Sequence, residues 1–396
     1  MKPTLLLLLG LALASPGFHP ARAADTPPTG LSAQGDTLLL QGRPFRGVGV
    51  NYFDLFSRRL RQPPDDTSLA GLRELGQAKV PFVRFMACGF WPVDNALYRT
   101  NPAIWFKTMD EVVQTAEASG VGLIPSLFWH LSTVVDLMGE PVGQLGNPQS
   151  RSRTFIRQYT KEMVTRYRNS PAIWGWELGN EYNLAADLPN AAQHRPPLWP
   201  KLGTATNRTE LDDFTSAMMT SLLADFAAVV RQHDPHRIIV SGNAIPRSTA
   251  WHNTREHSWK QDTLEQYAEV LLRDNPAPLD TLCIHLYPER KGNYPAAAGT
   301  LADVIARTQK IARQARRPLF IGEFGVGAST PTDTATRHLD EMLAAIERER
   351  VPLAALWVYD FKNQDQDWNV TFRNPRAWML ERLRQTNQRL QTKTTP

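Results

Sequence analysis

The chain has 396 residues, of which 42% are hydrophobic, 21% charged and 9% aromatic. These proportions are typical of a folded protein, and with only 2 cysteines they exclude a disordered, collagen-like or disulfide-stapled chain. The 44 Lys and Arg residues slightly outnumber the 39 Asp and Glu residues. These cations are spread along the chain without a run of five, so the charge pattern excludes nucleic acid as a favoured partner.

The first 23 residues have the pattern of a secretory signal peptide. A positive start precedes an apolar run, Leu5 to Ala14, that is too short to cross a bilayer, and a small-x-small tripeptide ends at Ala23. An N-terminal anchor is the alternative. The sequence predicts cleavage after Ala23, a secreted or periplasmic location, no membrane association after cleavage, and a mature chain of residues 24–396.

A small β-hairpin is predicted at the start of the mature chain, over 31–47, with a turn at Gly35 and Asp36. Eight short β-rich runs follow it. Each run is continuously apolar, as in parallel strands that are buried on both faces. The runs are 45–53, 81–87, 121–129, 172–181, 237–243, 281–287, 318–325 and 353–361.

A segment with helical periodicity follows each run, and several of these segments begin with Ser, Thr or Asn in a capping position. The segments are 68–79, 102–120, 154–170, 209–234, 263–275, 300–317, 335–350 and 375–390. Eight strands that each precede a helix predict a single-domain (β/α)8 TIM barrel of the α/β class. A doubly wound open sheet is the alternative, but the first run lacks the G-x-G-x-x-G turn of that fold.

The chain exceeds the ~250 residues of a typical barrel, and the surplus follows particular strands. The surplus stretches are 130–150, 182–209, 244–262, 288–299 and 361–375. All are strand-to-helix connections, which lie on the face where barrels place their active sites. We therefore expect long loops around a wide cleft.

Two acidic side chains lie at strand ends on opposite sides of the predicted barrel. The fourth run ends in Asn180 and Glu181, and the seventh carries Glu323. Polar groups at the ends of buried strands are costly unless they have a function. Two carboxylates that face each other suit glycosidic hydrolysis, with retention at a separation of ~5–5.5 Å and inversion at ~6.5–9.5 Å. A buried ion-paired group that only closes the barrel is the alternative.

Further polar and aromatic side chains lie at the ends of the other strands. Arg84 ends the second run, His130 follows the third, and Trp357 lies on the eighth. His285 and Tyr287 lie two residues apart on the sixth run, so they share one face of that strand. Each residue alone has an ordinary structural explanation, but together they form one constellation at the mouth of the barrel.

This ordered set resembles the active-site set of glycoside hydrolase family 5, the cellulase and mannanase family within the clan of retaining (β/α)8 enzymes. The resemblance covers the chain from about Leu31 to about Leu390 and is strongest at WGWELGNEYN, IHLYP and IGEFG. The set is Arg84, His130, Asn180, Glu181, His285, Tyr287, Glu323 and Trp357. It implies a glycoside hydrolase that acts on polysaccharide or oligosaccharide without a metal or cofactor. We expect the protein to be a monomer.

The resemblance also implies a double displacement. Glu323 would be the nucleophile, Glu181 the acid/base, and Asn180 would hydrogen-bond the sugar 2-OH. Arg84 and Tyr287 would bind Glu323 and hold it ionised, while less polar surroundings would keep the acid/base protonated.

The remaining members of the set would shape the sugar site next to the cleaved bond. His130 and His285 would line it, and Trp357 would form its stacking floor. Neighbours such as Asn180 and Glu181 face opposite ways on a regular strand, so the end of the fourth strand must deviate, for example through a bulge.

The motifs conflict over the substrate. WELGNE resembles the WELxNE of family mannanases, in which the first Glu, here Glu177, is structural. Many mannanases carry Asn where this chain has His130, whereas relatives that cleave glucans carry His. We expect an endo-acting enzyme on β-1,4-mannan or β-1,4-glucan, with an exo-acting β-glycosidase and a non-catalytic carbohydrate-binding barrel as alternatives. A metal-dependent barrel hydrolase would show H-x-H after its first strand, where this chain has Asn51-Tyr52-Phe53.

Several indole and thiol side chains carry further expectations. Trp174 and Trp176 are expected to pack against helices. Cys88 and Cys283 are expected to be separate buried thiols, because opposite strands of a barrel lie beyond the ~7 Å limit for bridging; a disulfide between them is the alternative. The indoles in or beside the strand-to-helix loops could stack on sugar rings. They are Trp91, Trp129, Trp199, Trp251, Trp259 and Trp368.

Overall fold

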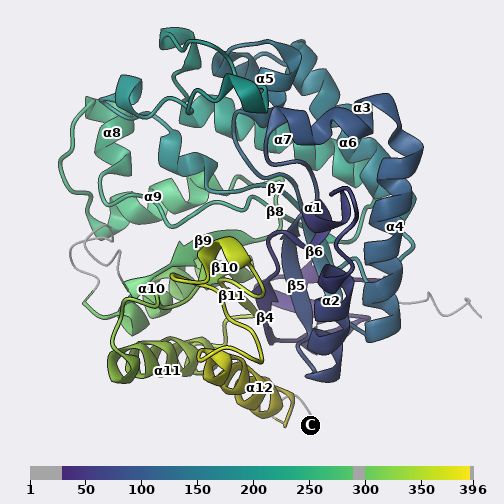
Figure 1. The fold of residues 1–396 in the computed structure, drawn as a ribbon. Helices are drawn as coiled ribbons and strands as arrows, with labels where there is room; N and C mark the ends of the chain where they lie inside the picture. Colours follow the sequence, from purple (N-terminus) through teal and green to yellow (C-terminus); the bar gives the residue numbers. More distant parts are fainter. Residues whose placement is uncertain (1–28, 289–298, 393–396) are drawn as a thin grey trace, which may run out of the picture.

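The computed structural model describes residues 29–288 and 299–392, so the predicted signal peptide lies outside the described residues. All eight predicted strands are present in the predicted order, and they form a nearly closed parallel barrel (Figure 1). The barrel strands are β4 (Gly47–Asn51), β5 (Phe82–Met86), β6 (Gly122–Phe128), β7 (Gly175–Gly179), β8 (Ile238–Val240), β9 (Leu282–Leu286), β10 (Leu319–Phe324) and β11 (Leu353–Leu356).

The strand order is β8-β7-β6-β5-β4-β11-β10-β9, and each hydrogen-bonded pair of strands is parallel. Just before β9, the Asp280 N–H donates to the Ile239 carbonyl of β8 at 3.1 Å. The two ends of the sheet therefore approach each other. The predicted (β/α)8 barrel is confirmed.

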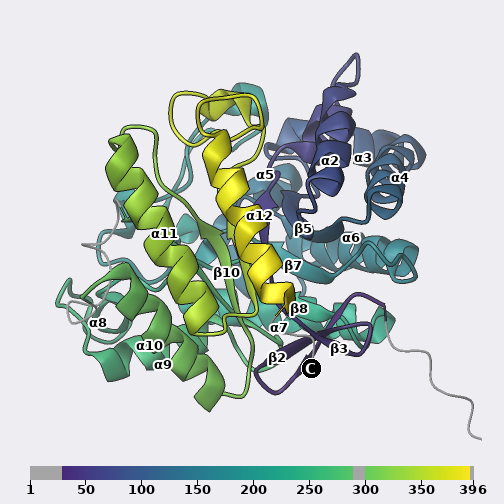
Figure 2. The same ribbon diagram turned by 90° about the horizontal axis from the view of Figure 1, so that it is seen from below.

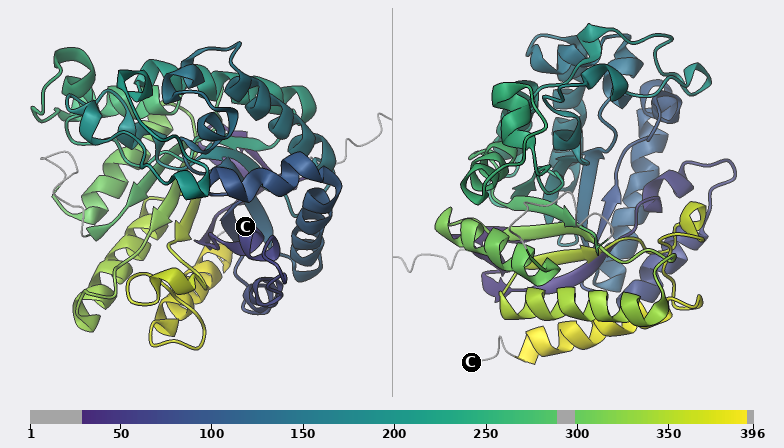
Figure 3. Two further views of the ribbon diagram at one scale, coloured as in Figure 1. Left: turned by 45° about the horizontal axis from the view of Figure 1, so that its top comes forward. Right: turned by 90° about the vertical axis from the view of Figure 1, so that its left-hand side faces the viewer.

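Helices surround the barrel on its outer face (Figure 3). The long ones are α2 (Thr67–Gln77), α4 (Pro102–Ser119), α6 (Arg151–Tyr167), α7 (Ser216–His233), α9 (Leu264–Asp274), α10 (Leu301–Gln314), α11 (Thr332–Arg348) and α12 (Ala377–Thr392). Shorter ones, α1 (Leu55–Arg59), α3 (Ala96–Thr100), α5 (Thr133–Met138) and α8 (Ala250–Glu256), lie within strand-to-helix connections. The main core fills the layer between strands and helices, where side chains such as Trp105 and Phe226 are fully buried.

One helix begins later than its pattern predicts. Residues 209–234 were expected to form one helix, but Thr209 caps only a short 3-10 turn, Glu210–Asp212, through a capping box with Asp212. A second cap at Thr215, whose side chain accepts from the Met218 N–H, then begins α7. Two capping signals in one periodic segment therefore make two helices.

A three-stranded antiparallel sheet precedes the barrel (Figure 2). The predicted hairpin is present as β1 (Leu31–Gln34) and β2 (Thr37–Leu40), and β3 (Arg43–Phe45) pairs with β2. The Leu31 N–H donates to the Trp174 carbonyl at 2.9 Å, and Trp174 packs edge-on against Phe45 at 5.0 Å. The small sheet thus covers the end of the barrel at which the strands begin.

The expectation that Trp174 packs against helices is wrong. Its indole belongs to the cluster inside the barrel, with Phe82 and Phe320, because Gly122 on the neighbouring strand leaves room for the ring. Trp176 does pack in the layer between strands and helices, and its Nε1–H donates to Asp234 at 2.9 Å.

The two cysteines are separate buried thiols, as expected. Burial raises the pKa of Cys88 to about 12, so this thiol stays protonated. Within residues 29–288 and 299–392, no helix combines the length and apolar character needed to cross a bilayer.

Candidate active site

A cleft of about 1100 Å3 lies at the end of the barrel where the strands finish. Its floor includes five of the residues that the sequence singles out. They are Asn180, Glu181, Tyr287, Glu323 and Trp357. These residues come from strands β7, β9, β10 and β11 or directly follow them. The barrel therefore brings together side chains that lie up to 177 positions apart in the chain, as 357 − 180 shows.

Glu323 lies near the end of β10, where the pairing with β9 and β11 shifts register around Gly322. A Cβ at Gly322 would lie 2.9 Å from the His285 ring, so only glycine fits at this irregularity. The Glu323 carboxylate is 5% exposed and accepts at both oxygens: Arg84 Nη1 donates to Oε1 at 2.8 Å and the Tyr287 hydroxyl donates to Oε2 at 2.5 Å. Burial, together with the charge and hydrogen bond of Glu323, raises the pKa of Tyr287 well above its ordinary value, so this hydroxyl remains a donor.

Glu181 follows β7 in the left-handed conformation, with φ 55°. Its N–H donates to the Gly242 carbonyl at 2.9 Å, and the Asn180 N–H donates to the Trp129 carbonyl at 3.1 Å. This deviation lets two adjacent side chains serve one site, as the sequence requires. The bulge proposed for β7 is not what produces it, because the deviation is a single left-handed residue after the strand.

Arg84 connects the residues of the floor. It is fully buried on β5, and its Nε donates to both oxygens of Glu177 at 2.9 and 2.8 Å. Its Nη2 donates to Asn180 Oδ1 at 2.8 Å, and its guanidinium lies 4.4 Å from the centre of the Trp129 ring. Burial would lower the pKa of Arg84, but the Glu177 and Glu323 carboxylates outweigh it and raise that pKa, so the cation is permanent.

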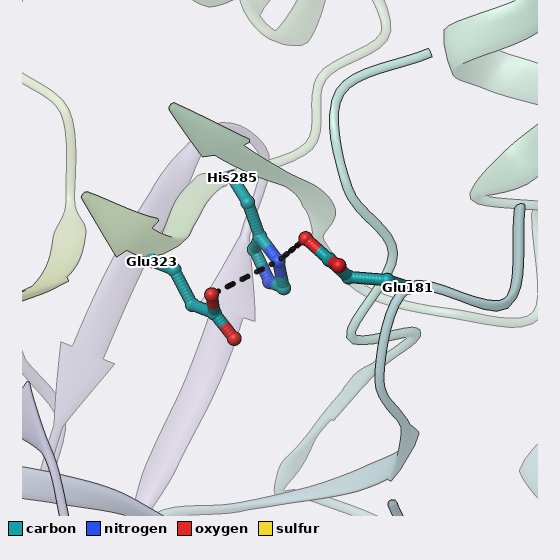
Figure 4. A group of neighbouring side chains, drawn as sticks. All are labelled: Glu181, His285 and Glu323. Atoms are coloured by element: carbon teal, nitrogen blue, oxygen red, sulfur yellow. Dashed lines mark hydrogen bonds and ion pairs between the residues drawn. The ribbon is translucent and has the colours of Figure 1, made fainter. Parts of the chain in front are cut away.

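His285 lies between the two acidic side chains, as Figure 4 shows. Its Nδ1 is 2.9 Å from Glu181 Oε1 and 3.6 Å from Glu323 Oε2. The sequence predicted less polar surroundings for Glu181, but its side chain is 24% exposed and contacts this imidazole. His285 and Tyr287 were predicted to share one face of their strand. His285 contacts Glu181, and Tyr287 donates to Glu323.

These three side chains can also be considered as metal ligands. One oxygen of each carboxylate and one ring nitrogen of His285 lie within 4.8 Å of one another. A tetrahedral zinc site with bonds of ~2.0–2.2 Å needs its ligands about 3.4 Å apart. Both oxygens of Glu323 already accept from Arg84 and Tyr287. The donor set therefore fits a hydrogen-bonded acid pair better than a metal centre.

Trp357 lies on the cleft floor, with its Nε1–H donating to Gln364 at 2.9 Å and its ring stacked near Trp129 at 6.0 Å. The His130 ring packs beside two rings that line the cleft, with its centre 5.1 Å from that of Phe90 and 5.6 Å from that of Trp91. The role of His130 in shaping the sugar site stays a prediction. Burial lowers the pKa of His130, which favours a neutral ring that supports these aromatics.

Sequence reasoning missed Asn51, the last residue of β4. Its Oδ1 accepts from Arg84 Nη1 at 3.0 Å and its Nδ2 donates to the Gly322 carbonyl at 2.9 Å, so it links Arg84 to β10. The other site residues were predicted because they are polar and lie at the ends of buried strands. Asn51 has the same two features, so the same rule could have identified it.

The walls of the cleft also differ from the prediction. Within residues 29–288 and 299–392, they come mainly from the connections after β4, β5 and β11, and the first two of these were not among the predicted surplus stretches. Three of the six loop indoles, Trp91, Trp129 and Trp368, line the cleft. Trp199 and Trp259 are 56% and 47% exposed outside it.

Comparison with known proteins places the chain among glycoside hydrolases. A family model described as cellulase, glycosyl hydrolase family 5, matches residues 46–363. A probable mannan endo-1,4-beta-mannosidase C from Aspergillus terreus is 31% identical over 140 residues. That match covers 34% of this chain, and the chain spans only 30% of the length of that relative.

Solved structures share the fold. The endo-1,4-beta-mannanase from Rhizomucor miehei superposes with a TM-score of 0.64 at 15% identity, covering 92% of this chain and 100% of that chain. The endo-beta-1,4-mannanase from Thermotoga petrophila gives 0.62 at 15% identity, covering 87% and 77%. The endoglucanase from Pseudomonas stutzeri gives 0.53 at 13% identity, covering 85% and 93%. Since the family model spans most of the barrel, from β4 into the loop after β11, the chain belongs to glycosyl hydrolase family 5.

Proposed function

We propose that this protein is a secreted, retaining and endo-acting glycoside hydrolase that cleaves β-1,4-linked mannan or glucan, with Glu323 as nucleophile and Glu181 as acid/base. One observation carries the proposal. The nearest carboxylate oxygens of the two residues lie within 4.8 Å of each other across the cleft floor. Such a close approach suits direct attack on an anomeric carbon, and it favours the ~5–5.5 Å carboxyl separation of retaining enzymes over the ~6.5–9.5 Å separation of inverting ones.

The surroundings of Glu323 favour the nucleophile role. It accepts hydrogen bonds from a permanent cation, Arg84, and from the Tyr287 hydroxyl. Both donors hold the carboxylate oxygens in place, one of which would attack the anomeric carbon. The burial of Glu323, at 5% exposed, keeps bulk water away from the glycosyl ester that would form.

The surroundings of Glu181 favour the acid/base role. Its side chain is partly exposed, and its Oε1 lies 2.9 Å from His285 Nδ1. A protonated Glu181 can donate to a neutral imidazole that carries its proton on Nε2. After the proton has passed to the leaving group, the carboxylate can activate water for the second step.

Two further residues would position the sugar. Arg84 engages Asn180 Oδ1, which turns the Asn180 amide N–H2 group toward the cleft as a donor for the sugar 2-OH. Trp357 offers its ring as a stacking floor, held by its hydrogen bond to Gln364. Polymer cleavage fits a cleft of about 1100 Å3, which exceeds the usual volume for a drug-sized ligand. Secretion rests on the signal-peptide pattern of residues 1–23.

The reaction can be tested with a panel of β-mannan, glucomannan, β-1,4-glucan and xylan. We expect the mature chain to release oligosaccharides of mixed length from mannan or glucan, and the first anomer seen by NMR to be β. An α anomer formed first would contradict retention. Release of only monomer or disaccharide from the outset would support the exo-acting alternative, and binding without hydrolysis would support the non-catalytic one.

Azide rescue separates the two carboxylate roles. With an activated aryl glycoside, Glu181→Ala should be rescued by azide to give a β-glycosyl azide, because the nucleophile is intact. Glu323→Ala should give the α-glycosyl azide, because azide then attacks in place of the carboxylate. The opposite assignment of products would show that the two roles are exchanged.

A further inference from the structure

Asn51, the last residue of β4, is linked to the proposed nucleophile in two ways. Its Nδ2 donates to the carbonyl of Gly322 at 2.9 Å, and Gly322 directly precedes Glu323 in β10. Its Oδ1 accepts from Arg84 Nη1 at 3.0 Å, and the same nitrogen donates to Glu323 Oε1 at 2.8 Å. One buried amide is therefore connected both to the backbone before Glu323 and to the cation that binds its carboxylate.

The partners of the Asn51 amide fix its orientation. A guanidinium only donates and a carbonyl only accepts, so the amide oxygen must face Arg84 and the N–H2 group must face Gly322. The carbonyls of Ala355 and Leu356 also accept from this Nδ2, at 3.3 and 3.4 Å. A carboxylate in the same place could accept from Arg84 but could not donate to any carbonyl. Both links together therefore require an amide.

The first link acts where β10 is irregular. The pairing of β10 with β9 and β11 shifts register around Gly322, so its carbonyl lies beside a break in the regular ladder. A buried carbonyl at such a break needs a hydrogen-bond partner, and Asn51 supplies one. Because Glu323 is the next residue, the place from which its side chain starts depends on how this peptide group is held.

The second link acts through the shape of the guanidinium. An arginine side chain carries five N–H groups in a rigid planar fork, so a bond at one of them helps to set the direction of the others. The two hydrogens of Arg84 Nη1 are divided between Asn51 and Glu323. Without the Asn51 oxygen, one of these buried N–H groups would lack its acceptor, and the fork would shift to regain one.

We propose that Asn51 is a positioning residue, which holds the Glu323 carboxylate in place for attack on the anomeric carbon without touching the sugar. This inference rests on the proposed function. Asn51 is fully buried, and among the described residues it does not belong to the lining of the cleft. Loss of its amide should therefore slow bond formation at the anomeric carbon and leave substrate binding unchanged.

The test compares Asn51→Ala with a matched control, Asn387→Ala. Asn387, on α12, is also buried, and its amide binds the N–H and the carbonyl of Val48 on the same strand, β4, at 2.8 Å each. Both variants should lower the midpoint of thermal unfolding, because each leaves buried polar groups without a partner.

Only Asn51→Ala should change the chemistry. We expect its kcat/KM to fall about 100-fold, since a shift of ~1 Å in a reacting group has an effect of this size. The Kd for the longest product oligosaccharide that the wild type no longer cleaves should not change, and titration calorimetry measures it. If Asn51→Ala does not fold, Asn51→Ser gives the same comparison with a smaller loss, because its hydroxyl can still donate or accept.

Aryl β-glycosides of the preferred sugar separate this role from an indirect effect on Glu181. A displaced nucleophile should lower kcat/KM by the same factor for phenyl and dinitrophenyl leaving groups. A displaced acid/base should lower it more for phenyl, the poorer leaving group, because phenyl depends on the proton that Glu181 would supply.

Four results would overturn the positioning role: wild-type kcat/KM in the folded Asn51 variant; a weaker Kd that accounts for the whole loss; a larger loss for the phenyl glycoside; or an equal loss of kcat/KM in Asn387→Ala. If the wild-type protein cleaves no β-glycan and no aryl glycoside, the proposed function fails instead.

Discussion

Arg84 shows why residue types at strand ends were informative. Its guanidinium donates hydrogen bonds to four polar side chains, which are those of Asn51, Glu177, Asn180 and Glu323. A buried cation costs too much free energy unless it has such partners. The sequence could therefore predict that Arg84 and the acids meet. It could not predict that the His130 ring packs beside Phe90, because the direction of a side chain after a strand depends on the loop and not on the strand's alternation.

Asp54 gives a prediction at the same scale. It is 6% exposed at the cleft wall, and its nearest cations are Arg58 at 3.8 Å and Arg61 at 4.0 Å. Burial raises the pKa of Asp54 from 3.8 to about 6, with Asp360 adding to the rise and the two arginines opposing it. The folded state therefore binds this proton more tightly than the unfolded state, so the stabilisation is complete below pH 3.8 and is lost as the pH rises through about 6.

The variant Asp54→Asn keeps this position neutral at every pH. Its gain in unfolding free energy over the wild type should be small at pH 4 and reach at most about 3 kcal/mol at pH 8. Urea denaturation at both pH values measures it. A gain that does not depend on pH, or one that is larger at pH 4, would contradict the burial argument.

At the scale of elements, the eight strands were predictable because each is a short, mainly apolar run that is buried on both faces. The helices in the walls of the cleft were not predictable, because α1 and α3 have only five residues each, too few to show a helical period. The left-handed turn at Glu181 was predicted only as a deviation, since its form depends on the neighbouring β8 connection and Gly242.

Gly242 makes this dependence testable. It has φ 74°, and a Cβ there would lie 1.8 Å from the Gly179 carbonyl oxygen. Gly242→Ala should destabilise the fold by about 2–4 kcal/mol and lower kcat, because Glu181 is hydrogen-bonded to this backbone.

The control is Gly120→Ala, which also has a positive φ, 64°, but has no atom within 4 Å of an added Cβ. It should cost only about 1 kcal/mol, with kinetics unchanged. Equal effects of the two variants in thermal unfolding and in kcat would show that the contact with Gly179 does not matter.

At the scale of the whole molecule, the barrel separates stability from chemistry. The small sheet and Trp174 close one end, and the acid pair occupies the other. The alternation of β-rich and helical segments predicted the barrel, and the turn residues predicted the hairpin. The position of the Trp174 indole inside the barrel was not predictable, because it needs the space that Gly122 leaves on a neighbouring strand. These two residues lie 52 positions apart, as 174 − 122 shows.

Trp174→Ala should therefore lower the unfolding free energy by about 3–5 kcal/mol and leave kcat/KM unchanged at temperatures where the variant is folded. Trp357→Ala should instead lower kcat/KM and change the unfolding free energy less than Trp174→Ala does, since the Trp357 ring is only partly buried and lies on the cleft floor. Thermal unfolding and initial rates on one soluble substrate measure both. A large loss of kcat/KM in the folded Trp174 variant would contradict the separation.

The most direct measurement is covalent trapping. A 2-deoxy-2-fluoro glycosyl fluoride of the preferred sugar slows the second step, so the glycosyl-enzyme should accumulate. Mass spectrometry of the digested protein should find one sugar attached to Glu323. The fluoride leaving group needs little help from an acid, so Glu181→Gln should be labelled about as fast as the wild type. Attachment at Glu181 or at any other residue, or inactivation without a covalent adduct, would contradict the assignment of the acid pair.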